Sequence, residues 1–231
     1  MRGAIAADIK VSLRWAIVLL AGGAGQRMGG VPKGLIHAEC RTILRRLVDA
    51  SQVLSPVQTV LVTGQHHDAL RTEVDTWPTG LRPEVIRHPS PGADPGRSLH
   101  LGLSQLRPGC NAVMVLLTDL ALIDAADLHA AAKVFAQRAN GKDCVWPFVD
   151  GVPAHPVMLT TTMAHGLVTR CETRLREWRT EHPERFQVWA TGNSHFIRDI
   201  DEPVHLAQLR QDSGLDWQLP TPAPVPHPGQ P

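Results

Sequence analysis

The sequence predicts a three-layer α/β/α sandwich with a mostly parallel sheet, and three observations support this fold class. Apolar runs of strand length alternate with helical stretches along most of the chain. The runs at 15–21 and 112–119 are nearly continuous in apolar residues, as strands covered on both faces are. The connections between successive elements are short, which is typical of α/β proteins. A single domain accounts for all three observations.

Seven strands and six helices are predicted along the chain. The strands are runs rich in β-branched, leucine or aromatic residues, and they lie at 15–21, 59–64, 84–88, 112–119, 143–148, 155–160 and 186–192. The helices fall between these runs or after the last one and carry apolar residues at helical spacing. They lie at about 41–54, 65–75, 97–106, 124–139, 169–181 and 203–212.

The domain is predicted to occupy residues 15–213, between two extensions. Residues 1–14 have no periodic pattern and are interpreted as an N-terminal extension. Residues 214–231 form a tail that ends in PTPAPVPHPGQP, which contains six prolines and cannot build a helix or a central strand. We expect this tail to be disordered.

Composition limits the classes of partner. The 231 residues are 43% hydrophobic and 19% charged, which is ordinary globular usage. A net charge of +1 gives no indication of a nucleic-acid partner or an acidic membrane surface. The apolar run near the N-terminus is far shorter than the ~20 residues that a membrane span requires, and no secretory leader is recognisable. We therefore expect a cytoplasmic protein.

The stretch LLAGGAGQRMGGVPKG, residues 19–34, follows the first predicted strand. This places a glycine-rich loop at the carboxyl edge of the sheet, where α/β folds bind ligands. Gly23, Gly25 and Gly29 give GxGxxxG, one residue too long for the dinucleotide fingerprint. Thr63 ends the second strand, where that fingerprint requires an acidic residue. A P-loop also fails, because Val31 follows the second glycine of the required interval.

The loop instead combines close backbone approach with two cations. Gly22, Gly23 and Gly25 expose backbone N–H groups that can surround an anion, and Arg27 and Lys33 follow them. Two mobile positive charges beside such a concavity suit a triphosphate. The alternative interpretation is a strand-to-helix turn with solvated cations.

The loop resembles the LAGGxxxRMGGxxKxLL motif of MobA/MocA-like nucleotidyltransferases, whose order and spacing it follows through Lys33. Three later regions also resemble this family: DPGRSLHLGLSQL; AVMVLLTDLALID; and GVPAHPVMLT together with IRDIDEPVHL. The resemblance spans the chain from Trp15 to about Leu209. It implies a single Rossmann-like domain that transfers CMP or GMP from CTP or GTP to molybdopterin with Mg²⁺. A molybdoenzyme or its chaperone is the partner protein that this pathway implies.

The resemblance also implies the site residues. The expected catalytic residues are Arg27, Lys33 and Asp119. The expected nucleotide-binding residues are Leu20, Ala21, Gly22, Gly23, Gly25, Arg27, Lys33, Thr63 and Ser98. Asp119 ends the predicted strand, just after its apolar run 113–117, so a metal-binding carboxylate would stand at the ligand edge of the sheet. Asp199 and Asp201 are both candidates for a second metal ligand, and spacing does not choose between them. His155, between two prolines, is expected to contact the acceptor.

The sequence does not decide which nucleotide base is recognised or which molecule is the acceptor. Gly23 is typical of the guanylyl branch, whereas SLHLGL and AHPV resemble the cytidylyl branch. Ala121 stands where the family usually has a proline after its metal aspartate, and His88 stands where the guanylyl branch has an acid. Two other functions fit the same residues. One is a nucleotidyltransferase that acts on another small phosphorylated acceptor, such as a sugar phosphate. The other is a non-catalytic accessory protein that binds the cofactor.

Overall fold

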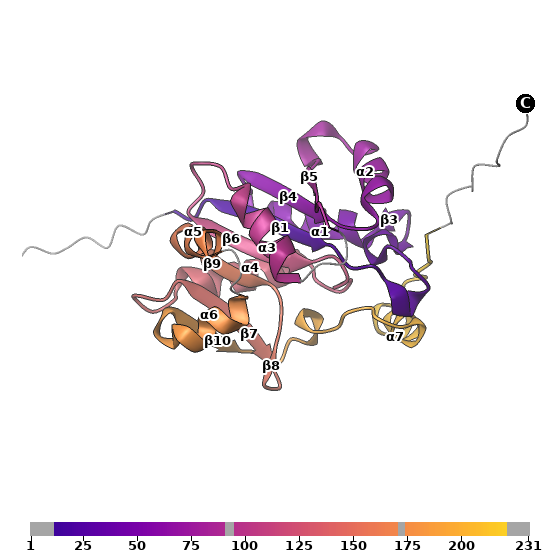
Figure 1. The fold of residues 1–231 in the computed structure, drawn as a ribbon. Coiled ribbons are helices and arrows are strands. Elements are labelled where there is room, and N and C mark those ends of the chain that lie inside the picture. The colour runs from indigo at the N-terminus through magenta and orange to yellow at the C-terminus, as the bar shows by residue number, and fades with distance from the viewer. Residues whose placement is uncertain (1–11, 91–94, 171–173, 221–231) are drawn as a thin grey trace, which may run out of the picture.

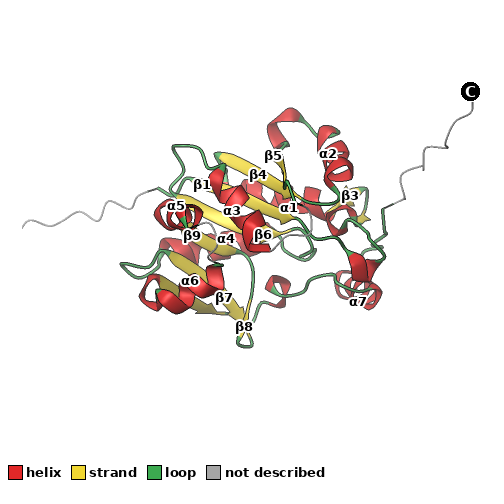
Figure 2. Ribbon diagram, in the orientation of Figure 1, coloured by secondary structure: helices red, strands yellow, loops and turns green. Residues whose placement is uncertain are grey.

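The computed structural model describes residues 12–90, 95–170 and 174–220. An eight-stranded sheet runs through its centre, with helices on both faces (Figures 1 and 2). The strand order is β10-β7-β9-β6-β1-β4-β5, and β8 pairs with β7 outside this path. The strands are β1 (Trp15–Ala21), β4 (Gln58–Thr63), β5 (Glu84–Arg87), β6 (Ala112–Leu117), β7 (Cys144–Val149), β8 (Val152–Pro153), β9 (Val157–Thr160) and β10 (Phe186–Ala190).

The sheet is mostly parallel, as predicted. Strand β1 pairs in parallel with β4 and β6, β4 with β5, and β7 with β10. Strand β9 is the exception, because it runs antiparallel to both β6 and β7, between which it lies. The carboxyl ends of β1 and β6 therefore meet at one edge of the sheet, and β9 begins at that same edge.

Two layers of helices bury the two faces of the sheet. Helices α3 (Pro95–Ser104), α5 (Thr161–Thr169) and α6 (Leu175–Glu181) pack on one face, around Val115 and Trp146. On the other face the core includes side chains from α1 (Ile43–Ser51), α2 (His67–Asp75), α4 (Ala125–Ala136) and α7 (Pro203–Ser213). The predicted three-layer α/β/α sandwich is confirmed.

The helix predicted at 169–181 is wrong in its extent. Two helices occupy this region, α5 from Thr161 and α6 from Leu175. The hydroxyl of Thr160 accepts a hydrogen bond from the Met163 backbone N–H (3.2 Å) and begins α5 directly at the end of strand β9. The β-branched residues Thr160 to Thr162 extend the strand pattern in the sequence, so the start of the helix carries no turn residue to reveal it.

The domain does not end at residue 213, which corrects the predicted boundary. Trp217 is 1% exposed, and the Arg46 guanidinium lies 5.1 Å from the centroid of its ring. Gln218 exchanges two backbone hydrogen bonds with His37, of 2.7 and 3.0 Å, on the short β2–β3 hairpin (His37–Ala38 and Arg41–Thr42). The segment up to Gln218 therefore packs on the domain. The rest of the predicted tail from residue 221, and residues 1–11 of the N-terminal extension, lie outside the described residues.

In the described part of the chain, no helix has the length and apolar character needed to cross a bilayer.

Candidate active site

The glycine loop after β1 folds back on itself around Gly25. The Gly25 carbonyl accepts hydrogen bonds from the backbone N–H groups of Met28 (2.9 Å) and Gly30 (3.0 Å). Gly25 has φ +62°, and a Cβ atom there would lie 2.1 Å from the Val31 carbonyl oxygen. This position therefore requires glycine. At Gly23, by contrast, an added Cβ would meet nothing within 4 Å.

A cleft of about 610 Å³ opens beside this loop. Most of the residues predicted to bind nucleotide line it. The lining comes from four regions of the sequence and consists of Leu20, Gly22, Gly23, Ala24, Gly25, Gln26, Arg27, Lys33, Ser98, Leu117, Asp119 and Asp201. Ser98 comes from α3, and its hydroxyl oxygen is 3.0 Å from the position of a Cβ atom at Gly22. Ala21 lines a smaller pocket that shares Lys33 and Asp119 with this cleft.

Three carboxylates lie close together, and two of them, Asp119 and Asp201, line the cleft. Asp119 follows β6, while Asp199 and Asp201 lie on the segment that joins β10 to α7. One oxygen from each of the three lies within 4.8 Å of the others. A hydrogen bond from the Ile200 backbone N–H to the Asp119 carbonyl oxygen (3.2 Å) joins the two segments. The structure thus brings together all three acids predicted as metal ligands, including both candidates for the second metal ligand.

These acids fit a divalent cation. Asp119 Oδ1 is buried and has no hydrogen-bond partner among the described residues. Burial raises the pKa of Asp199, and the neighbouring charges of Asp201 and Asp119 raise it further. A shared cation would satisfy the unpaired oxygen and offset the repulsion, and carboxylate oxygens are preferred ligands of Mg²⁺.

The two predicted cations of the loop lie against the acids. Lys33 Nζ is 3.2 Å from Asp119 Oδ2 and also forms an ion pair with Asp201. Burial acts to lower the pKa of Lys33, but Asp119 and Asp201 outweigh it and raise that pKa, so the ammonium stays charged. Arg27 pairs with Asp201 as well, while its side chain remains 65% exposed to solvent. The hydrogen bond from Lys33 is the main cause that lowers the pKa of Asp201.

The structure does not bring Thr63 to the cleft. Its side chain is fully buried and lines neither the cleft nor the smaller pocket beside it. The hydroxyl donates to the Ile86 carbonyl oxygen (3.1 Å) and is 2.7 Å from His67 Nδ1. Side chains alternate between the two faces of a strand, and at this strand end the hydroxyl is used inside the protein. His66, which the prediction did not include, instead supports the loop, since its Nε2 is 3.0 Å from the Ala24 carbonyl oxygen.

His155 lies beside the cleft, outside its lining. It directly precedes Pro156 in the β8–β9 connection, and its Nδ1 is 3.5 Å from the Val115 carbonyl oxygen. Burial lowers the pKa of His155 to about 4, so the imidazole is neutral near pH 7. Leu117, two residues after Val115 on β6, lines the cleft. His155 is therefore a neutral side chain next to the site, and its predicted contact with an acceptor stays a prediction.

A buried carboxylate fixes the segment that carries Asp199 and Asp201. Asp127, at the start of α4, accepts hydrogen bonds from the Asn193 amide (2.6 Å) and the Asp124 backbone N–H (3.0 Å), and its Oδ2 is 2.8 Å from His195 Nδ1. Sequence reasoning missed this link, because nothing in the local pattern connects α4 with a segment more than sixty residues later.

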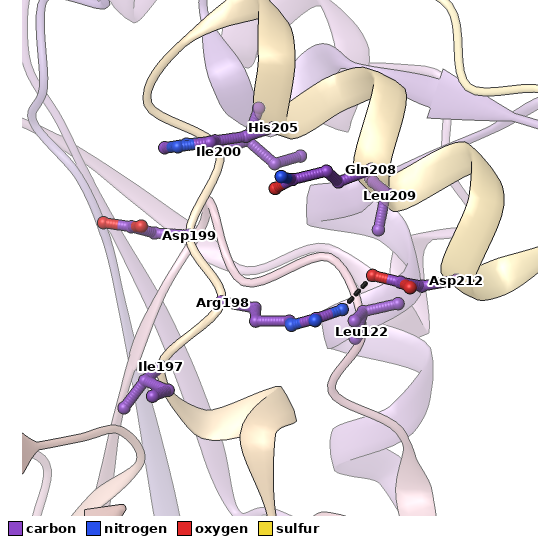
Figure 3. A pocket seen from close by; sticks show the side chains of 9 residues that line it. All are labelled: Leu122, Ile197, Arg198, Asp199, Ile200, His205, Gln208, Leu209 and Asp212. Carbon is purple, nitrogen blue, oxygen red and sulfur yellow. Dashed lines mark hydrogen bonds and ion pairs between the residues drawn. The ribbon is translucent and has the colours of Figure 1, made fainter. Parts of the chain in front are cut away.

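The far end of the same segment is tied to α7. In Figure 3, Arg198 points toward α7 and forms an ion pair with Asp212, whereas Asp199 points to the other side of the chain. These residues line a pocket of about 200 Å³ behind the segment. The contacts of Asp127 and the Arg198–Asp212 ion pair thus fix the segment that carries the acids at two points.

Replacing Asp127 with alanine should destabilise the protein by about 2 kcal/mol, because it leaves polar partners of a buried carboxylate unsatisfied. Unfolding in urea, followed by tryptophan fluorescence, measures this change. Asp68→Ala is the matched control, since Asp68 also stands in the first turn of a helix but its side chain is 89% exposed. Equal midpoints for the two variants would contradict the anchoring role of Asp127.

Comparison with known sequences identifies the domain. Residues 17–186 match the MobA-like NTP transferase domain. Over 84 residues, 36% of this chain, the sequence is 37% identical to the bifunctional IPC transferase and DIPP synthase of Thermococcus kodakarensis, and the match covers 19% of that protein. The chain spans about a fifth or less of the length of the curated relatives that it matches.

Solved structures have the same fold. Rv0371c from Mycobacterium tuberculosis H37Rv is similar with a TM-score of 0.69 at 19% identity, over 87% of this chain and 98% of that one. Rv0371c has also been solved as a complex with manganese. Molybdopterin-guanine dinucleotide biosynthesis protein A from Archaeoglobus fulgidus is similar with a TM-score of 0.63 at 17% identity, over 86% and 98% of the two chains. The matched domain covers most of the present chain and includes the glycine loop. The protein therefore belongs to the MobA-like NTP transferase family of nucleotidyltransferases.

Proposed function

We propose that this protein transfers CMP or GMP from CTP or GTP to the phosphate of molybdopterin or the molybdenum cofactor, with release of pyrophosphate. The observation that carries the proposal is the cleft in which Arg27, Lys33, Asp119 and Asp201 lie beside the glycine loop. The similar fold of a molybdopterin-guanine dinucleotide biosynthesis protein supports this acceptor. Because the loop recognises the NTP, the acceptor is a separate part of the proposal.

The transfer is a single displacement at phosphorus. An oxygen of the acceptor phosphate forms a bond to the α-phosphorus, and the bond from the α-phosphorus to the oxygen that bridges to the β-phosphorus breaks. Pyrophosphate leaves with that electron pair. Backbone N–H groups of the loop, together with Arg27 and Lys33, bind the β- and γ-phosphates and stabilise the charge that develops on the leaving group. Catalysis then depends mainly on alignment and electrostatics.

Asp119, Asp199 and Asp201 are the residues that we propose to hold Mg²⁺. A divalent cation bound there would neutralise phosphate charge and polarise the reacting phosphoryl group. Lys33 contacts both Asp119 and Asp201 and offsets their mutual repulsion. The manganese complex of the similar Rv0371c supports a divalent ion, and the all-carboxylate ligand set supports Mg²⁺ as the physiological one.

The proposal is tested by measuring pyrophosphate release with CTP and with GTP, each with molybdopterin or glucose 1-phosphate as acceptor. We expect release with one NTP, dependent on Mg²⁺ and on molybdopterin. Pyrophosphate release with glucose 1-phosphate but not with molybdopterin would instead indicate that the acceptor is a sugar phosphate. Metal-dependent NTP stabilisation in a thermal-shift assay, with no release for either acceptor, would instead indicate a non-catalytic accessory protein.

Gly23 offers a direct test of the base. Replacing it with alanine should leave the stability of the fold unchanged, because an added Cβ meets no atom within 4 Å. We expect the ratio of kcat/KM for CTP to that for GTP to rise by about tenfold, since one small contact at the base is worth about 1–2 kcal/mol. Competition between the two NTPs measures this ratio.

The matched variant is Gly25→Ala, in which the added methyl group collides with the backbone at Val31. It should reduce the use of both NTPs without changing their ratio. An unchanged ratio in Gly23→Ala would remove this residue from base selection.

A further inference from the structure

The connection between β4 and α2 contacts the glycine loop at two points. His66, the residue before α2, donates a hydrogen bond from Nε2 to the Ala24 carbonyl oxygen (3.0 Å), because a carbonyl oxygen can only accept. Two residues earlier, Gly64 is buried against the loop, and a Cβ atom there would lie 2.5 Å from the Gly22 carbonyl oxygen. The connection therefore confines the carbonyl groups of two alternate residues of the loop.

These two carbonyl groups determine where the following N–H groups point. In a planar trans peptide the C=O bond and the next N–H bond point in opposite directions. The N–H groups of Gly23 and Gly25 therefore lie on the side of the loop that faces away from the β4–α2 connection. Gly23 and Gly25 line the cleft, and no residue of that connection does. The geometry thus directs both N–H groups toward the cleft.

The same two N–H groups are available to a ligand. In the part of the chain that the structure describes, the backbone N–H groups of Gly23 and Gly25 donate no hydrogen bond, whereas those of Met28 and Gly30 both donate to the Gly25 carbonyl. Free N–H groups at alternate positions of a loop form a concavity that binds anions. A triphosphate in the cleft would therefore meet donors whose direction is already set.

We propose that His66, together with Gly64, is a positioning residue for the triphosphate of the NTP. By confining the two loop carbonyl groups, these residues direct the N–H groups of Gly23 and Gly25 at phosphate oxygens. The imidazole itself contacts no phosphate. This inference rests on the proposed function and adds to it a side chain outside the cleft. A glycine-rich loop is costly to order, so a contact that orders it before the nucleotide arrives strengthens binding.

The first test measures the affinity of the full chain for inorganic tripolyphosphate, CTP and GTP with Mg²⁺ by isothermal titration calorimetry. His66→Ala should weaken binding of tripolyphosphate and of the NTP by the same factor, about tenfold, because only the phosphates use the loop N–H groups. His66→Gln should restore most of the affinity, since its side-chain amide can donate from a similar position. The KM for the NTP should rise in parallel, whereas a loss of folded protein would lower kcat at unchanged KM.

His67→Ala is the matched control, because this neighbouring half-buried histidine contacts the Thr63 hydroxyl and not the loop. It should bind tripolyphosphate like the wild type. Wild-type affinity in His66→Ala would overturn the proposal. Weaker binding of the NTP but not of tripolyphosphate would also overturn it, since the effect would then lie at the base.

Gly64→Ala tests the second contact, because the added methyl group collides with a loop carbonyl oxygen. It should weaken tripolyphosphate binding by at least about tenfold. Gly80→Ala is its control, since a Cβ atom there meets nothing within 4 Å. Equal affinities of the two variants would remove Gly64 from the positioning of the loop.

Hydrogen exchange without nucleotide separates this inference from the proposed function. The N–H groups of Met28 and Gly30 report whether the loop keeps its turn, because both donate to the Gly25 carbonyl. Their exchange, followed by NMR, should accelerate in His66→Ala and not in His66→Gln, and wild-type rates in His66→Ala would overturn the anchoring. If the wild type bound tripolyphosphate but released no pyrophosphate with any acceptor, the proposed function would fail while the positioning role stands.

Discussion

Asp119→Ala is expected to lower the rate of pyrophosphate release by about a thousandfold, which corresponds to about 4 kcal/mol of transition-state stabilisation. Asp119 is the acid that stands at the end of a central strand, and its buried Oδ1 has no hydrogen-bond partner among the described residues. Its loss removes a proposed metal ligand at the point where phosphate charge must be neutralised. A continuous assay of pyrophosphate release measures the change.

The fold should survive this substitution. The hydrogen bond that joins Asp119 to Ile200 uses the backbone carbonyl, which alanine retains. Mn²⁺ binding, followed by electron paramagnetic resonance, should weaken together with activity. Asp216→Asn serves as a control, because Asp216 is a surface carboxylate whose side chain is 77% exposed. If Asp119→Ala bound Mn²⁺ and released pyrophosphate like the wild type, the metal assignment would be lost.

Lys33→Met is expected to reduce pyrophosphate release by about a hundredfold or more, because a positioned cation that stabilises a leaving phosphate typically supplies about 3 kcal/mol or more. Methionine keeps the length and apolar stem of the lysine but has no charge. Lys33 also neutralises Asp119 and Asp201, so its removal should leave Mn²⁺ affinity unchanged or stronger. Activity should thus fall without any loss of metal affinity.

Retained metal affinity distinguishes Lys33 from the acids. Asp119→Ala should lose both properties, whereas Lys33→Met should lose only catalysis and NTP affinity. Arg45→Met is a suitable control for the charge, because Arg45 pairs with Asp49 on α1, away from the cleft. Full activity in Lys33→Met, or a parallel loss of Mn²⁺ binding, would contradict the role of Lys33 as a phosphate cation.

The sequence predicted the positions of those site residues that stand at the ends of strands. Asp119 and the glycine loop each follow an apolar run, and parallel strands bring such positions to one edge. Asp199 and Asp201 had no such geometric basis and came from a family resemblance, but the structure brings both to the same place. Thr63 lies outside the cleft, because the end of a strand sets the height of a residue in the sheet but not the direction of its side chain.

Other features depend on contacts that no local pattern contains. Trp217 packs against Arg46 from a region whose prolines suggest disorder, and only tertiary burial explains its position. In the sequence, Asp127 looks like an ordinary acidic residue in the first turn of a helix. Its contacts with Asn193 and His195 form only when the chain is folded, so no local pattern predicts them. Long-range polar contacts of this kind determine how firmly the acids are held, so they matter for function although they are invisible in the sequence.

The reversed direction of β9 has a consequence for how specificity can be changed. In a fully parallel sheet, every residue at the edge that binds ligands would lie in a loop that follows a strand. A change in one of these loops would then disturb the neighbouring loops. Here His155 reaches that edge from the beginning of a strand, through the short β8–β9 turn, while the NTP loop follows β1. On the proposed function, donor and acceptor recognition would therefore reside in separate connections. Exchanging the β8–β9 turn should retune the acceptor while leaving the choice of nucleotide intact.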